Sequence, residues 1–167
     1  MKTTKKGFTL IELIVVIAII GVLAAILVPS MLGYVKKSKV SSANSAANSL
    51  QKAINTALVE VDEESQEAGN ITGITSAGGT SKEVVFAPTS VKTSKEDFKK
   101  KVDNYMEKAA SKKWAASCSG GVCLAVAIEV DGTYTGTAPG GVVTVDNYTK
   151  YSGKCGDALT EALKKVS

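Results

Sequence analysis

Histidine and arginine are both absent from this chain of 167 residues, and their absence restricts its chemistry. Without histidine there is no His-containing catalytic triad, and the commonest general base and metal ligand are missing. Without arginine, no side chain can bind phosphate or carboxylate through the two parallel hydrogen bonds of a guanidinium. Asp, Glu, Lys, Ser and Cys remain available to an enzyme, but the missing side chains favour a protein that is not an enzyme and needs no cofactor or metal.

Aromatic side chains are also scarce, with one Trp, three Phe and five Tyr. A membrane-tethered ligand-binding domain would require a concave site with converging polar groups or an aromatic platform. The composition makes this alternative weak. Trp114 is predicted to be a packing anchor in the core rather than a platform for a ligand.

Positive charge is concentrated at the N-terminus. The formal net charge is +4, but Lys2, Lys5 and Lys6 all precede Phe8. Removing these three charges from +4 leaves +1, so the rest of the chain is nearly neutral. A near-neutral chain gives no electrostatic argument for direct binding of nucleic acid.

A long apolar run follows these lysines. From Leu13 to Val28 there is no polar side chain, and residues 13–35 carry no charge. As an α-helix this stretch is long enough to span the hydrocarbon core of a membrane. The lysines on its N-terminal side predict that the N-terminus lies in the cytoplasm and the remainder of the chain outside.

Two simpler interpretations of this run are a secretory signal peptide and a plain signal anchor. Ala24 and Ala25 offer small residues for signal cleavage, but apolar residues 26–28 would remain after the cut, and the run is longer than a typical signal core. Neither interpretation explains Glu12 at the edge of the run. A carboxylate within a membrane segment indicates a functional role by default.

Residues 5–12, KKGFTLIE, and the apolar run after them resemble the processing signature of type IV prepilins and pseudopilins. The similarity covers about residues 5–33, roughly a fifth of the chain. It implies cleavage of leader 1–7 after Gly7 by a prepilin peptidase and N-methylation of the new terminus at Phe8. Glu12 matches the acidic residue of the family, and Pro29 matches the proline that kinks its helix. Gly21 and Pro29 bracket a segment of lower helical stability, and the resemblance implies that this segment bends or melts when subunits pack.

The residue chemistry supports a role for Glu12 in assembly. Cleavage would free an α-amine on Phe8 with an ordinary pKa near 8, which is largely charged at neutral pH. In an apolar bundle both charges need partners, and pairing between staggered subunits satisfies both. The alternative is a carboxylate that merely reaches the membrane surface. For Pro29, the alternative is a proline that the membrane helix tolerates without a functional bend.

The resemblance therefore implies a structural subunit of a type IV pilus that serves adhesion, twitching-type motility or uptake. Its partners would be further copies of the chain in a helical filament, the prepilin peptidase, the inner-membrane assembly machinery, and lipid before assembly. The precursor would cross the membrane once and end in an extracellular filament. A pseudopilin of a type II secretion or DNA-uptake machine is the alternative that shares this N-terminal chemistry.

An amphipathic helix is predicted to continue the membrane segment. Apolar residues recur every three or four positions, which forms one stripe on a helix: Val40, Ala43, Ala47, Leu50, Ile54, Ala57 or Leu58, and Val61. One helix is therefore expected over residues 8–61, with residues 8–35 as the transmembrane or filament-core half and 36–61 as the amphipathic half. It would be roughly 80 Å long.

The head, residues 62–167, is predicted to be α+β, with a small antiparallel sheet and extra helices. Residues 62–82 are expected to form a loop, and Val84–Phe86 a short strand. A helix is expected over residues 94–112 with Ser94 as N-cap, and a C-terminal helix over 157–166. Strands are expected within residues 123–145: 123–130, a two-residue turn at Asp131-Gly132, 133–137 and 142–145.

Three cysteines lie in the head: Cys118, Cys123 and Cys155. In an exported head they allow one disulfide and leave one thiol over. We favour a bridge from Cys155 to either Cys123 or Cys118, which would tie the C-terminal segment to the sheet. The alternative is a thiolate metal site, which is less favoured because zinc commonly needs a fourth protein ligand and no histidine is available.

Overall fold

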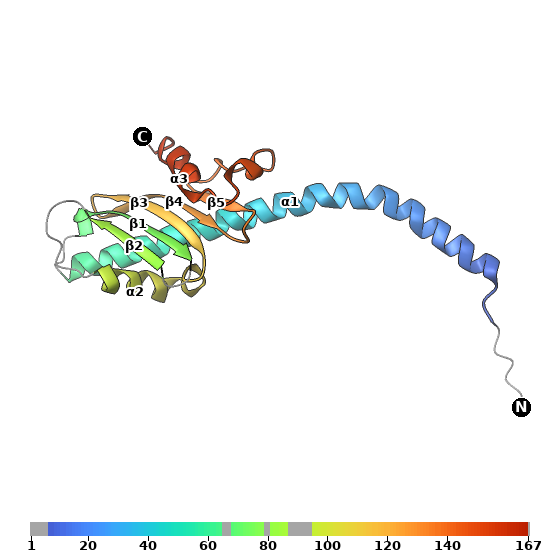
Figure 1. Ribbon diagram of the computed structural model, residues 1–167, viewed down its shortest axis with the longest axis horizontal. Coiled ribbons are helices and arrows are strands. Elements are labelled where there is room, and N and C mark those ends of the chain that lie inside the picture. Colours follow the sequence, from blue (N-terminus) through green and yellow to red (C-terminus); the bar gives the residue numbers. More distant parts are fainter. Residues whose placement is uncertain (1–6, 65–67, 79–80, 87–94, 167) are drawn as a thin grey trace, which may run out of the picture. The chain divides into compact units, whose positions relative to one another are not determined.

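The computed structural model describes residues 7–64, 68–78, 81–86 and 95–166. The chain divides into two compact units, Met1–Lys36 and Lys37–Ser167, and each is described here by itself. The first helix, α1 (Leu10–Glu63), contributes to both units (Figure 1). The predicted helix over residues 8–61 is therefore confirmed to within two residues at each end.

The second half of α1 packs in the core of the head. Its predicted stripe is confirmed, because all of its members are buried: Val40, Ala43, Ala47, Leu50, Ile54, Ala57, Leu58 and Val61. Ala53 is buried with them. The spacing of three and four residues places these side chains on one face of the helix, where they pack against the sheet.

The sheet has five antiparallel strands in the order β2-β1-β3-β4-β5. The strands are β1 (Ile71–Gly78), β2 (Ser81–Phe86), β3 (Lys113–Ser119), β4 (Val122–Glu129) and β5 (Thr135–Ala138). The predicted α+β class is confirmed. The predicted strand at 84–86 falls within β2, and the predicted strand at 123–130 coincides with β4 apart from one residue at each end.

Each face of the sheet has its own apolar core. On one face α1 and α2 (Lys95–Tyr105) pack against alternate residues of the central strands, with Trp114 and Ala116 from β3 and Val126 and Ile128 from β4. On the other face Ala125 and Ala127 contact α3 (Cys155–Leu163) and the segment before it. Side chains alternate between the two faces of a strand, so one run of small apolar residues in β4 serves both cores. Figure 1 shows α3 on the side of the sheet opposite α1.

Trp114 is a packing anchor, as predicted. It is 1% exposed, and its indole Nε1 donates a hydrogen bond of 3.0 Å to the carbonyl oxygen of Ala109. The predicted helix over residues 94–112 is too long. The α-helix ends at Tyr105, Met106 has non-helical angles, and a 3₁₀ helix (Glu107–Ala109) then leads the chain into β3. The predicted N-cap, Ser94, lies outside the described residues.

Two strands occupy segments for which no strand was predicted. Strand β1 lies within residues 62–82, predicted to be a loop, and β3 has the sequence KWAASCS. Strand β3 is rich in small residues of low β-propensity, whereas β1 contains Ile and Thr interrupted by Gly, Ser and Ala. They are stabilised by their position, since β1 and β3 pair with each other and each has a further neighbour. This stabilisation depends on residues distant in sequence.

The predictions for residues 131–166 also require correction. The connection from β4 to β5 is five residues long, 130–134, rather than a two-residue turn, and Glu129 pairs with Thr135. Residues 142–145 do not form a strand; Val142 and Val143 are buried under α3 instead. The C-terminal helix begins at Cys155 and ends at Leu163, not at 157 and 166.

Candidate functional site

The first turn of α1 is closed by three hydrogen bonds between Thr9 and Glu12. The Glu12 carboxylate accepts from the backbone N–H of Thr9 at 2.8 Å and from its hydroxyl at 2.5 Å. The hydroxyl oxygen of Thr9 in turn lies 3.4 Å from the backbone N–H of Glu12, which donates to it. This is a capping box, a motif with Thr at the N-cap and Glu three residues later.

The sequence pattern Thr-x-x-Glu is the signal that predicts this motif, whereas the charge of Glu12 alone does not. The capping box has a chemical consequence. Within the isolated chain the carboxylate is bonded to groups of its own first turn, and its side chain stays exposed. Glu12 is thus accessible to a further cationic partner.

The remainder of the first unit presents an apolar surface. Every large apolar side chain from Phe8 to Val35 is between 44% and 82% exposed. Gly21 and Gly33 leave room for approach, since a Cβ at either position would meet nothing within 4 Å. Soluble monomers rarely expose an apolar surface of this extent, so it must be covered by lipid or by other protein.

Pro29 lies inside α1, which continues through it as α-helix. Proline lacks an N–H, so one hydrogen bond of the helix is missing at this position. The next residue, Ser30, donates its hydroxyl to the carbonyl oxygen of Leu27 at 2.9 Å. A bend or local melting at Gly21 and Pro29 remains a prediction.

Over the described residues, α1 is the single helix that is long and apolar enough to cross a membrane. Its most apolar window has a mean hydropathy of 3.2 and is not buried inside the protein. Length and composition thus agree with the predicted transmembrane half.

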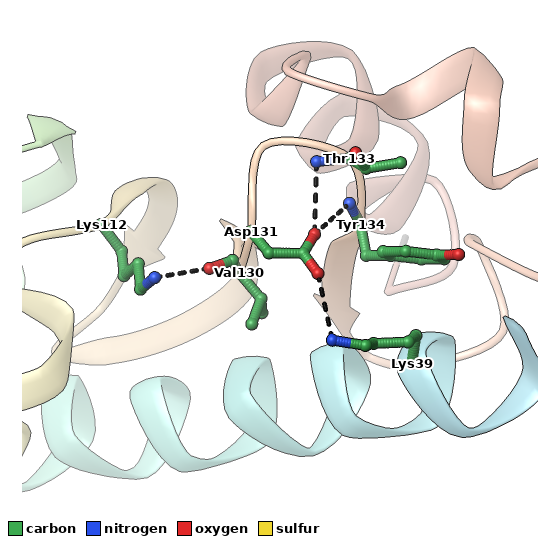
Figure 2. Close-up of polar contacts among 6 residues, drawn as sticks. All are labelled: Lys39, Lys112, Val130, Asp131, Thr133 and Tyr134. Carbon is green, nitrogen blue, oxygen red and sulfur yellow. Dashed lines mark hydrogen bonds and ion pairs between the residues drawn. The ribbon is translucent and has the colours of Figure 1, made fainter. Parts of the chain in front are cut away.

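In the second unit, the connection between β4 and β5 is fixed to α1 by Asp131 (Figure 2). Its carboxylate accepts from the backbone N–H groups of Thr133 and Tyr134 at 3.3 and 3.1 Å, and from Lys39 Nζ at 3.4 Å. Desolvation alone would raise the pKa of Asp131, but the hydrogen bonds from Tyr134, Thr133 and Lys39 outweigh it and hold this pKa below its ordinary value. Lys112 Nζ supports the same loop by donating to the carbonyl oxygen of Val130 at 2.5 Å.

The structure places Cys118 and Cys123 together and Cys155 apart from both, whereas the predicted bridge joined Cys155 to one of them. Cys118 and Cys123 are opposite each other on β3 and β4 and belong to the core between the sheet and α1. Cys155 packs with the core beneath α3, with its Sγ 3.5 Å from the carbonyl oxygen of Lys113. No disulfide joins them in this structure, and no group of three metal-ligating side chains gathers in the described part of the chain.

Known proteins match this chain most clearly at the processing signature. The family model of the prokaryotic N-terminal methylation motif matches residues 2–28. A type IV major fimbrial protein FimA of Dichelobacter nodosus is 48% identical over 60 residues, which are 36% of this chain and 38% of that protein. The type IV major alpha-pilin of Moraxella bovis is 40% identical over 83 residues, or 47% of this chain and 52% of that protein.

A fimbrial protein of Pseudomonas aeruginosa is 46% identical over 56 residues, covering 34% of this chain and 36% of that protein. These matches support a type IV pilin. The chain thus spans about a third to a half of the length of the pilins that it matches. No solved structure gives a significant match. The motif match includes Gly7, Phe8, Glu12 and Gly21, whereas Pro29 lies one residue beyond it.

Proposed function

We propose that the chain is the structural subunit of a type IV pilus, made as a membrane-anchored precursor and assembled through α1 into an extracellular filament. One observation carries the proposal: the first half of α1 exposes all of its large apolar side chains, and Glu12 supplies its single charge before Lys36. Lipid would cover this surface in the precursor, and the same surface of other copies would cover it in the filament.

In this proposal the leader ends at Gly7, where the prepilin peptidase cuts, and Phe8 becomes the methylated N-terminus. The α-amine of Phe8 then becomes the cationic partner of Glu12 on a neighbouring copy. The capping box supports this step, because Thr9 holds the carboxylate by two hydrogen bonds next to the position of the new terminus. A carboxylate has room for further donors, so it can keep these bonds and accept the amine.

The head would then present its surface at the outside of the filament, where adhesion, motility or uptake would depend on it. In the second unit, α1 is covered by the sheet along its buried stripe. We therefore assign the assembly role to residues 8–35.

The first test determines the species present in cells. Material sheared from the cell surface is digested and its N-terminal peptide measured by mass spectrometry. The expected peptide begins at Phe8 and carries one added methyl group. A chain that begins at Met1, or one that is cut among the alanines near residue 24, contradicts the proposal. Short assemblies within the cell envelope instead of surface fibres would favour a pseudopilin.

The second test addresses Glu12 itself. In Glu12→Gln the shape of the side chain is kept but the charge is lost, and we expect a processed, membrane-held chain that forms few or no fibres. The matched control is Glu63→Gln at the other end of α1, where the carboxylate is exposed, and fibres should form as in the wild type. Surface fibres are counted by electron microscopy, and processing is followed by mass. Normal fibre numbers in Glu12→Gln would disprove the proposed pairing of Glu12 with the Phe8 amine of a neighbouring copy.

A further inference from the structure

The β3–β4 hairpin places two buried cysteines side by side. Its turn is the pair Gly120-Gly121, whose φ angles of 59° and 79° are the left-handed values that a tight two-residue turn requires. Ser119 pairs with Val122 across the turn, and Cys118 pairs with Cys123 next to it. The two cysteines are 3% and 2% exposed.

A one-residue bulge brings both thiols to the same face. Ser117 pairs with Ala125 and Cys118 with Cys123, so Leu124 is an extra residue on β4. In a regular register, Cys118 would face Leu124, and Cys123 would point to the side of the sheet that carries Ala125. The bulge instead turns Cys123 toward α1, and Cys123 and Cys118 both belong to the core on that side.

The backbone of Cys123 bonds to α1. Its N–H donates to Asn55 Oδ1 at 2.7 Å, and its carbonyl oxygen accepts from Gln51 Nε2 at 3.1 Å. In an antiparallel sheet, two residues that face each other without exchanging backbone hydrogen bonds have Cα atoms about 4.5 Å apart. This separation lies within the Cα–Cα range of disulfides. The neighbouring Cys118 thiol, followed by burial, raises the pKa of Cys123.

Cys155 cannot form a disulfide with Cys118 or Cys123, because it is too far away and lies on the other face of the sheet. Its Sγ lies beside Lys113, five residues before Cys118 along β3, or about 16 Å away at the rise of a strand. It also packs in the core on the opposite face of the sheet. Burial, followed by the charge of Glu129, raises the pKa of Cys155 to about 11, so this thiol is mostly protonated at neutral pH.

We propose that Cys118 and Cys123 form a disulfide that locks the β3–β4 hairpin, and that Cys155 stays a free thiol. The oxidant is a disulfide of a small thiol or of a protein. One cysteine thiolate attacks the oxidant and releases one thiol, which leaves a mixed disulfide. The second cysteine attacks this bond and releases the other thiol, so the pair loses two electrons and two protons and the oxidant becomes two thiols.

The bridge rests on the hairpin geometry, so its test does not require a filament. Purified full-length chain in detergent is incubated with oxidised glutathione, in a low urea concentration that lets the buried hairpin open. It is then denatured, alkylated without reduction and digested with trypsin. Because trypsin cuts after lysine, one peptide (114–150) holds Cys118 and Cys123, and another (155–164) holds Cys155.

We expect peptide 114–150 to be mainly unlabelled and lighter by two hydrogens, and peptide 155–164 to bear one label. Cys118→Ala should restore one label on peptide 114–150, whereas the control Cys155→Ser should leave that peptide unlabelled. Alkylation in denaturant makes the count independent of how well a variant folds. Mainly labelled cysteines on peptide 114–150, or its linkage to peptide 155–164, overturns the inference. Neither result affects the filament proposal, which depends on the species beginning at Phe8.

Discussion

Gly136 of β5 lies directly against the backbone of Ala43 in α1. A Cβ built at Gly136 would be 1.9 Å from the carbonyl oxygen of Ala43 and 2.1 Å from its carbonyl carbon. Backbone atoms cannot move aside as a flexible side chain can. Neighbouring contacts fix the approach, because Asn44 accepts from the N–H of Thr137 at 3.0 Å and donates to the carbonyl oxygen of Val143 at 3.4 Å.

Gly136→Ala is therefore expected to destabilise the head, because α1 and β5 must separate to admit a methyl group. Overpacking typically costs about 1–3 kcal/mol, and a backbone clash places this variant at the upper end. The free energy of unfolding is measured by urea denaturation of the full chain in detergent. Gly140→Ala is the control, since a Cβ there meets nothing within 4 Å, and its unfolding should match that of the wild type. Equal midpoints for the two variants would contradict this packing.

The close contact of Gly136 illustrates which parts of the fold the sequence could predict. Helix α1 could be predicted because its signal is local: an apolar run followed by a stripe at helical spacing. Strand β4 was predicted for the same reason, since its own residues are apolar and β-branched. The requirement for glycine at position 136, in contrast, comes from contact with a helix residue more than ninety positions earlier in the chain. No local sequence pattern indicates this requirement.

Small residues explain why β3 was not predicted. The β3 sequence KWAASCS has little intrinsic preference for a strand, and its pairing with β1 and β4 determines its structure. The pairing of the cysteines could not be predicted from the sequence either. Their count and compartment could be argued from sequence, but their pairing depends on the extra residue Leu124, which no spacing rule reveals.

Asp131 predicts a dependence of stability on pH. Its pKa is lowered in the folded head, so the folded state binds this proton less readily than the unfolded chain does. The carboxylate contributes its full stability above the ordinary Asp value of 3.8, and this contribution is lost as pH falls below that value through the lower folded pKa. The ion pair with Lys39 is exposed, so we expect the loss to be about 1 kcal/mol or less.

Asp131→Asn should remove this part of the acid sensitivity. The amide oxygen can still accept from Thr133 and Tyr134, so the variant isolates the charge. Unfolding free energies of the wild type and the variant, measured between neutral pH and pH values below 3.8, should converge at the acid end. Asp146→Asn, which removes the charge of another exposed carboxylate, is the matched control. A constant gap between wild type and Asp131→Asn across this range would refute the assignment.

Trp114 contributes both packing and a hydrogen bond. In Trp114→Phe most of the apolar volume is kept, but the buried carbonyl oxygen of Ala109 loses its indole donor. We expect a loss of roughly 1–3 kcal/mol, whereas Trp114→Ala should lose about 3–5 kcal/mol because it also opens a cavity. Urea denaturation of the full chain measures both. If Phe is as destabilising as Ala, the cost arises from the hydrogen bond; if Phe is neutral, that bond contributes nothing.

The capping box predicts that Thr9 controls the order of the first turn of α1. Thr9→Ala removes the hydroxyl that donates to the Glu12 carboxylate and accepts from the backbone N–H of Glu12. We therefore expect the first turn to lose about 1 kcal/mol of local stability. Hydrogen exchange of the amides at Glu12 and Leu13, in detergent, should then accelerate about fivefold, while amides of the buried stripe exchange at the wild-type rate. Thr9→Ser keeps the hydroxyl and should retain wild-type protection. If Thr9→Ala shows no acceleration, the hydroxyl does not cap the helix, and Glu12 must be positioned by other contacts.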